Sequence, residues 1–149
     1  MKILVDTNVI LDVLFEREPF VAHSSSIMGR VERRTLNGIL CATTLTTLHY
    51  LTCKTIGKAK GSAAIKKLLQ IYQVAPVDQA ILMHALDSGF SDFEDAALYA
   101  AAIQAGAEAI ITRNTKDFRL AEIPVLTPEE FMVKKVNTLK RKEIDSGRR

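Results

Sequence analysis

Three aspartates in this sequence fall at positions where a layered α/β protein can hold a metal ion. Asp6 directly follows the apolar residues 3–5, Asp95 lies in the first turn of a predicted helix, and Asp117 lies just past another apolar segment. Each position is at the carboxyl end of a predicted strand, or at a helix start that should face that edge. Open parallel sheets collect their ligands there. We therefore expect the three carboxylates to meet in space.

Carboxylates that meet require a counter-charge. Two unit charges about 4 Å apart repel each other by roughly 4 kcal/mol at an effective dielectric constant near 20. Mg²⁺ or Mn²⁺ offsets that repulsion, because both ions prefer oxygen ligands. A water bound to such an ion can attack phosphorus while the ion neutralises charge on the phosphate oxygens. The three acids thus predict a divalent metal site suited to phosphate chemistry.

Each acid also has a simpler explanation. Asp6 could cap the helix that follows it, Asp95 could complement a helix dipole, and Asp117 could be an ordinary loop acid. Asp12 is expected to be a solvated helix residue. The metal hypothesis therefore depends on the coincidence of three positions, not on any one of them.

Polar residues near these acids are candidates for supporting roles. Thr112 and Asn114 could orient a metal-bound water, while Arg113 and Lys116 could contact a phosphate or form plain surface charge. The further acids Asp92 and Glu94 are expected to cap their helix or to complement its dipole, although either could join the site.

Strands alternate with helices along the chain, which indicates a parallel sheet with right-handed crossovers. The expected strands cover residues 2–6, 39–42, 71–77, 109–112 and 125–126. The expected helices cover residues 8–15, 20–34, 44–56, 62–69, 79–88 and 91–106, with a last helix from 127, and residues 57–61 form a loop. Ser91 and Glu94 match a capping box, and Gly106 occupies a helix C-cap position.

The composition fits one domain with a full hydrophobic core. The chain has 149 residues, of which 48% are hydrophobic, and no apolar run approaches the roughly 20 residues that cross a bilayer. Neither a secretory signal nor a metal-ligand spacing of Cys41 and Cys53 is found, so we expect a cytoplasmic protein with reduced thiols.

The positive charge is concentrated at the C-terminal end. Residues 134–149 contain seven basic and two acidic residues, whereas the whole chain has a net charge of +3. We therefore divide the chain into a domain over residues 1–133 and a basic, flexible tail over residues 134–149. The tail could contact a phosphate backbone, but it has no interleaved aromatic residue that would stack on bases, which favours a solvated terminus without a partner.

Four segments together resemble the PIN domain family of metal-dependent ribonucleases. They are Asp6-Thr7-Asn8 with the following Val-Ile-Leu-Asp, residues 92–96 (DFEDA), residues 112–118 (TRNTKDF) and residues 123–131 (IPVLTPEEF). The resemblance covers nearly all of residues 2–133. It implies a three-layer α/β/α fold whose central parallel sheet has about five short strands, with an acidic pocket at the strand ends.

The resemblance also implies roles for individual residues. Asp6, Asp95 and Asp117 would be the first, third and fourth metal-binding acids, Thr7 and Asn8 would line the pocket, and Asn114 would lie beside the metal. Many family members are toxins of VapBC-type toxin–antitoxin pairs, which cleave RNA and are inhibited by a small antitoxin protein, and dimers are common. A homodimer and such an antitoxin are therefore expected partners.

The sequence departs from the family pattern at the second acid. That acid is expected early in the helix after the second strand, where residues 43–50 (TTLTTLHY) contain no carboxylate, and Thr47 takes its place. A hydroxyl is a neutral ligand, so metal affinity should fall unless Asp92 or Glu94 compensates.

Three functions remain as hypotheses. The first is a Mg²⁺- or Mn²⁺-dependent ribonuclease that uses Asp6, Asp95 and Asp117. The second, favoured by the missing acid, is a PIN-like module that binds RNA or a protein without turnover. The third is a receiver-like signalling domain, which is disfavoured because the first strand is followed by a single acid and the second strand ends without one.

Overall fold

The computed structural model describes residues 1–147, except for the side chains of residues 135–140 and 142. In chain order the elements are β1 (Lys2–Val5), α1 (Thr7–Leu14), α2 (Val21–Glu32), β2 (Asn37–Cys41), α3 (Ala42–Ile56), α4 (Lys58–Ile71), β3 (Gln73–Ala75), α5 (Gln79–Asp87), α6 (Phe93–Gln104), β4 (Ala109–Ile111), the 3₁₀ turn η1 (Thr115–Phe118), β5 (Val125–Leu126) and α7 (Pro128–Gly147).

The five strands form one parallel sheet in the order β3-β2-β1-β4-β5. The chain therefore adds β2 and β3 on one side of β1, and then β4 and β5 on the other side. Residues 3–5 of β1 pair with residues 109–111 of β4, so the two strands end together. The gap between their carboxyl ends is the topological switch point, where α/β sheets bind ligands.

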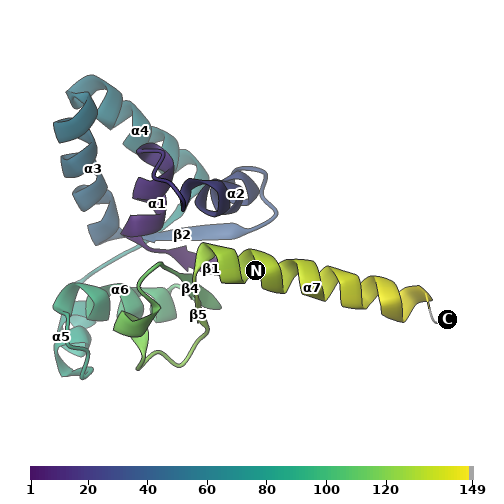
Figure 1. The fold of residues 1–149 in the computed structure, drawn as a ribbon. Coiled ribbons are helices and arrows are strands. Elements are labelled where there is room, and N and C mark those ends of the chain that lie inside the picture. Colours follow the sequence, from purple (N-terminus) through teal and green to yellow (C-terminus); the bar gives the residue numbers. More distant parts are fainter. Residues whose placement is uncertain (148–149) are drawn as a thin grey trace.

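Alternation along the strands divides the core into two layers. Ile3 and Val5 point to one face of the sheet and pack with α1–α4 and α7, whereas Leu4 points to the other face and packs with α6. Ile110 of β4 likewise packs on the α6 side of the sheet. Its neighbours Ala109 and Ile111 pack on the opposite side, with Ile3 and Val5. Figure 1 shows the resulting arrangement, with α1–α4 above the sheet and α5 and α6 below it. The predicted three-layer α/β/α fold is confirmed.

The prediction of a loop at residues 57–61 is wrong. Helix α3 runs to Ile56, Gly57 alone joins it to α4, and its φ of +92° suits glycine. Lysines at 58 and 60 suggested a loop, but the first turns of α4 expose them while Gly61 is buried against α3. Strand β3 is correspondingly shorter than expected, because α4 continues through residue 71.

The cap predicted for α6 is displaced by one residue. Asp92, not Ser91, is the N-cap, and its carboxylate accepts a hydrogen bond of 2.8 Å from the backbone N–H of Asp95. At the other end Gly106 has a φ of +80°, as expected just after a helix. Capping by Asp92 places Asp95 at the third position of the helix, facing the sheet edge.

The residues expected to form a tail continue a helix. Helix α7 runs from Pro128 to Gly147, so a boundary at residue 133 falls inside it, and Figure 1 shows α7 extending away from the sheet. Residues 148–149 lie outside the described residues. Within the described residues, no helix is long and apolar enough to cross a membrane.

Candidate active site at the carboxyl edge of the sheet

Asp6 is the most enclosed acid of the site. It follows β1 directly, is the N-cap of α1, and is only 8% exposed. Its Oδ1 accepts a 2.7 Å hydrogen bond from the Thr7 backbone N–H, and its Oδ2 accepts one of 2.8 Å from the Thr112 hydroxyl. Burial raises the pKa of Asp6, these two hydrogen bonds oppose the rise, and the negative charge of Asp117 adds to it. Asp6 is thus both a helix cap and a member of an acidic cluster.

Thr112 and Asn8 connect the two strand ends. The Thr112 hydroxyl, fully buried just after β4, also accepts hydrogen bonds from the Asn8 Nδ2 at 3.3 Å and from the Asn114 backbone N–H at 3.1 Å. Asn8 Nδ2 lies 3.4 Å from Asp6 Oδ2, and Asn8 Oδ1 accepts a 3.2 Å bond from the Arg113 backbone N–H. This network fixes the loop after β4 against the first turn of α1.

Asp95 and Asp117 complete the acidic cluster from two other segments. Burial is the main cause that raises the pKa of Asp95 to about 7, and repulsion from Asp92, Asp6, Asp117 and Glu94 raises it further. Asp117 is exposed on η1, which the buried Phe118 anchors in the core. Acids that are far apart in sequence therefore sense one another's charge at the β1–β4 switch point.

The start of α3 contributes hydroxyls where the family pattern has an acid. Thr44 is buried, and its hydroxyl accepts a 3.1 Å hydrogen bond from the Thr7 hydroxyl, one residue from Asp6. Thr47 lies one turn further along and is partly buried. Helix α3 has no acidic residue in its first turn, so it brings no negative charge to the cluster.

Asp12 is not solvated, contrary to expectation. It is fully buried in α1, and its carboxylate accepts two bonds from the Arg113 guanidinium, at 2.7 Å from Nε and 3.1 Å from Nη2. The Ser24 hydroxyl lies 3.5 Å from the same carboxylate. The guanidinium of Arg113 is therefore held by Asp12, whereas Lys116 and the Asn114 side chain are exposed beside the cluster.

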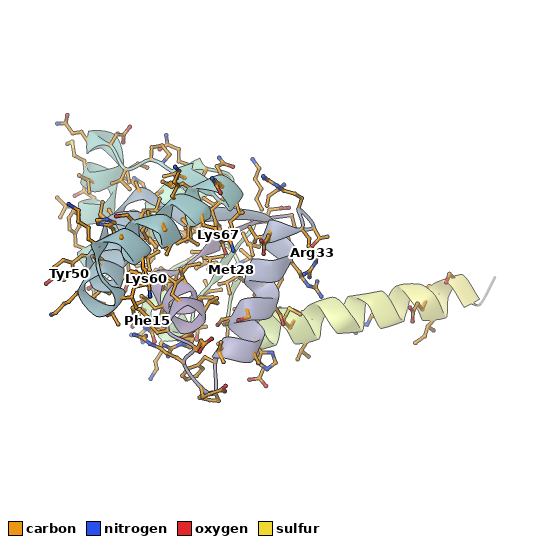
Figure 2. The ribbon with its side chains drawn as sticks, turned by 90° about the horizontal axis from the view of Figure 1, so that it is seen from above. Phe15, Met28, Arg33, Tyr50, Lys60 and Lys67 are labelled. Atoms are coloured by element: carbon orange, nitrogen blue, oxygen red, sulfur yellow. The ribbon has the colours of Figure 1, made fainter. Side chains whose placement is uncertain are left out.

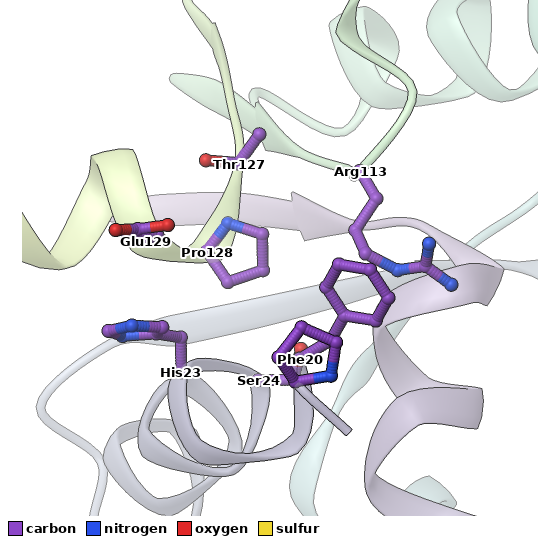
Figure 3. A pocket seen from close by; sticks show the side chains of 8 residues that line it. Phe20, His23, Ser24, Arg113, Thr127, Pro128 and Glu129 are labelled. Carbon is purple, nitrogen blue, oxygen red and sulfur yellow. The ribbon is translucent and has the colours of Figure 1, made fainter. Parts of the chain in front are cut away.

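A pocket of about 440 Å³ lies beside the Arg113 side chain, between the start of α2 and the start of α7. The guanidinium carbon of Arg113 stands 4.0 Å from the ring centre of Phe20 and forms part of the pocket wall, which Figure 3 shows together with His23, Pro128 and Glu129. Sequence reasoning missed this pocket, because its walls come from three segments that are distant in the chain.

The donor set of the cluster suits a hard divalent cation, since it consists of carboxylate, amide and hydroxyl oxygens. Among the described residues, no three carboxylate, histidine or cysteine side chains already have the spacing of metal ligands. The acids that would hold such an ion are Asp6, Asp95 and Asp117, with Asn8 and Thr112 behind them.

Comparison with known proteins agrees with this architecture. The profile of the PIN domain matches residues 2–116. Ribonuclease VapC1 of Aquifex aeolicus is 34% identical over 136 residues, which are 87% of this chain and 92% of that protein. Among solved structures, a toxin–antitoxin complex from Klebsiella pneumoniae matches with a TM-score of 0.62 and 25% identity, covering 84% of this chain and 96% of the other. FitAcB from Neisseria gonorrhoeae matches with a TM-score of 0.64 and 22% identity, covering 85% and 97%. The chain therefore belongs to the PIN domain family.

Proposed function

We propose that this protein is a divalent-metal-dependent ribonuclease of the toxin–antitoxin type. The observation that carries the proposal is the meeting of Asp6, Asp95 and Asp117, which come from three separate segments of the chain. The charge of Asp117 helps to raise the pKa of Asp6, and the charges of Asp6 and Asp117 help to raise the pKa of Asp95. The 34% identity to a VapC ribonuclease supports RNA as the substrate class. RNA phosphodiesters supply the negative charge that such a metal site attracts.

The residues of the site would have different roles in metal binding and substrate contact. Asp6, Asp95 and Asp117 would hold Mg²⁺ or Mn²⁺, which would supply an activated water and offset charge on the phosphate. Thr112 and the Thr7 amide keep Asp6 in one orientation through bonds of 2.8 and 2.7 Å. The exposed side chains of Asn114 and Lys116 are available to a water and to a phosphate oxygen.

Cleavage of a labelled RNA in the presence of Mn²⁺ tests this proposal. Asp6→Asn keeps the shape of the side chain and removes its charge, so the cleavage rate should fall by roughly 100-fold or more. The matched control is Asp87→Asn, which changes an exposed aspartate at the far end of α5. Equal cleavage by the parent and Asp6→Asn would end the proposal.

A binding module without turnover is the second candidate. It is favoured by the hydroxyls of Thr44 and Thr47 at the start of α3, because they leave the cluster with one negative charge fewer than the family pattern. RNA binding that persists in a chelator, together with no cleavage in Mn²⁺ or Mg²⁺, would support this candidate over the first.

We also propose a small antitoxin protein as a partner, on the basis of the toxin–antitoxin complex among the similar folds. The site of action would be the cytoplasm, where RNA is available and the two free thiols, Cys41 and Cys53, stay reduced. Co-expression with a small protein encoded beside this chain should yield a stable complex that no longer cleaves RNA. Unchanged cleavage after co-purification would exclude that protein as the inhibitor.

A homodimer is the proposed oligomeric state. Helix α5 exposes Leu82, Met83 and Leu86, which lie on one side of the helix by their spacing of three and four residues. Leu86 is 70% exposed. Apolar side chains grouped in this way on a surface mark an interaction site, and a second copy would cover them.

A further inference from the structure

Acidic and basic residues are unevenly distributed along the chain. All 17 acidic residues lie outside the segment from residue 33 to residue 77, which spans β2, α3, α4 and β3. The same segment contains seven basic residues, all of them exposed: Arg33, Arg34, Lys54, Lys58, Lys60, Lys66 and Lys67. A segment with seven exposed cations and no carboxylate of its own favours a positive potential at its surface.

Several of these residues lie on the outer side of the α1–α4 layer (Figure 2). Arg34 Nη2 donates to the Gln70 carbonyl at 3.5 Å, which brings the turn after α2 to the end of α4. Lys60 and Lys67 are seven residues apart on α4 and therefore share one side of that helix. Figure 2 views this layer from above and shows Arg33, Lys67, Lys60 and Tyr50 across it.

An exposed aromatic ring lies within this basic surface. Tyr50 of α3 is 65% exposed, and the Lys54 ammonium lies 5.9 Å from its ring centre. A largely exposed ring with a cation close to it is the kind of platform on which an unpaired base stacks. An acidic protein would also be attracted to this basic surface, but an exposed ring among lysines fits single-stranded nucleic acid better.

One stripe of α3 connects this ring to the acidic cluster. Thr43, Thr47, Tyr50 and Lys54 follow one another at spacings of four, three and four residues, so they lie along one side of the helix. The stripe starts in the turn that contains Thr44, whose hydroxyl bonds to Thr7 beside Asp6. Thr47 and Tyr50 are separated by about 4.5 Å of helical rise. A strand of RNA on this stripe would lead directly to the acids.

We propose that the surface formed by Tyr50, Lys54, Lys60 and Lys67 binds the single-stranded RNA substrate on one side of the cleavage site. This inference rests on the proposed function for the identity of the RNA as substrate. The lysines contact successive phosphates, Tyr50 stacks on a base, and the start of α3 delivers the strand to Asp6, Asp95 and Asp117.

The test is binding of a fluorescently labelled single-stranded RNA, measured by anisotropy in a chelator at several KCl concentrations. All proteins carry Asp6→Asn, so that no cleavage interferes. The triple variant Lys54→Gln/Lys60→Gln/Lys67→Gln should raise the Kd by about tenfold or more. It should also reduce the slope of log K against log salt by about 2, since each phosphate contact on a single strand contributes roughly 0.7. Tyr50→Ala should weaken binding at least about fivefold, and Tyr50→Phe should keep it.

A triple variant at the C-terminal end, Lys140→Gln/Arg141→Gln/Lys142→Gln, removes the same total charge and is the matched control. A loss of affinity as large in this control as in the α3–α4 variant would overturn the proposal, because net charge alone would then explain the effect. Unchanged RNA affinity in the α3–α4 variant would also overturn it, and would leave the surface to an acidic protein partner.

Failure of the proposed function gives a different result. If the parent protein cleaves no RNA in Mn²⁺ but its binding depends on Tyr50 and the three lysines, hydrolysis is excluded and the binding surface stands. If the parent cleaves RNA with a KM that the α3–α4 triple variant does not change, the surface is excluded and hydrolysis stands.

Discussion

At the scale of single residues, the raised pKa of Asp95 should make the stability of the metal-free protein depend on pH. Its pKa is raised from 3.8 to about 7. At a pH between these two values, Asp95 is protonated in the folded protein but ionised in the unfolded chain. Between these two values the folded state binds more protons, and the free energy of unfolding therefore falls as the pH rises. Asp95→Asn removes the contribution of Asp95 to this dependence. In a chelator it should raise the Tm relative to the parent at pH 8 and change it much less at pH 4.

Thermal unfolding at the two pH values, with Asp87→Asn as the control for loss of one exposed negative charge, measures this effect. Asp6 adds to the same trend, because its pKa is also raised by burial. A parent protein whose stability increases from pH 5 to pH 8 in the chelator, with Asp95→Asn following it in parallel, would contradict the assignment.

The buried pair of Asp12 and Arg113 gives the second residue-scale prediction. Arg113→Met leaves a fully buried carboxylate without its cation and should lower the free energy of unfolding by about 3–5 kcal/mol. Adding Asp12→Leu removes the stranded charge and should restore most of that loss, since apolar replacements of buried pairs are often neutral. Urea unfolding of the parent, the single variant and the double variant checks this. Equal stabilities for the single and double variants would show that the carboxylate is not stranded.

Sequence reasoning reached some of these residues and not others. Asp6 and Asp95 could be selected because a strand end and a helix start are visible in the sequence. The prediction that Asp12 is solvated is wrong, because its partner Arg113 lies 101 residues away in the sequence. One signal was available, because Asp12 is three residues after Val9 on the buried side of α1. The distances between the acids depend on the sheet register, which the sequence does not specify.

At the scale of elements, the contact between α3 and α4 depends on one glycine. A Cβ at Gly61 would lie 2.6 Å from the Cys53 sulfur and 2.8 Å from the Cys53 backbone nitrogen. Backbone atoms cannot move aside cheaply, so Gly61→Ala should destabilise the protein by about 1–3 kcal/mol despite the better helix propensity of alanine. The control is Gly147→Ala, where a Cβ meets no atom within 4 Å. Urea unfolding in which both variants are equally stable would refute close packing at Gly61.

The order and type of the elements were predictable, while several boundaries were not. Alternation of apolar strands and amphipathic helices is a local signal, so the parallel layered fold followed from it. The predicted start of α4 at residue 62 is wrong, because the lysines near Gly57 are typical of a loop. Gly61, Ile65 and Leu68 have the spacing of a buried helix side and indicate an earlier start. Strand ends depend on pairing with distant partners and are therefore not fixed locally.

At the scale of the whole molecule, the apolar side of α5 should control self-association. Leu86→Lys places a charge at the centre of the proposed contact and should convert a dimer to a monomer, as measured by size-exclusion chromatography with light scattering. Leu69→Lys is the control, because Leu69 is an exposed leucine on α4, away from that contact. A parent protein that is monomeric at high micromolar concentration, or a Leu86→Lys variant that remains dimeric, would exclude α5 as the interface.

The position of β1 has a consequence for how the protein is made. β1 is synthesised well before its neighbour β4, and Thr112, which bonds to Asp6, lies 106 residues further along the chain. A nascent chain thus emerges from the ribosome with Asp6 well before it gains Asp95 and Asp117. Any product of a message cut short before residue 95 lacks two of the three acids. The candidate metal site of three acids therefore stays incomplete until residue 117 has been synthesised.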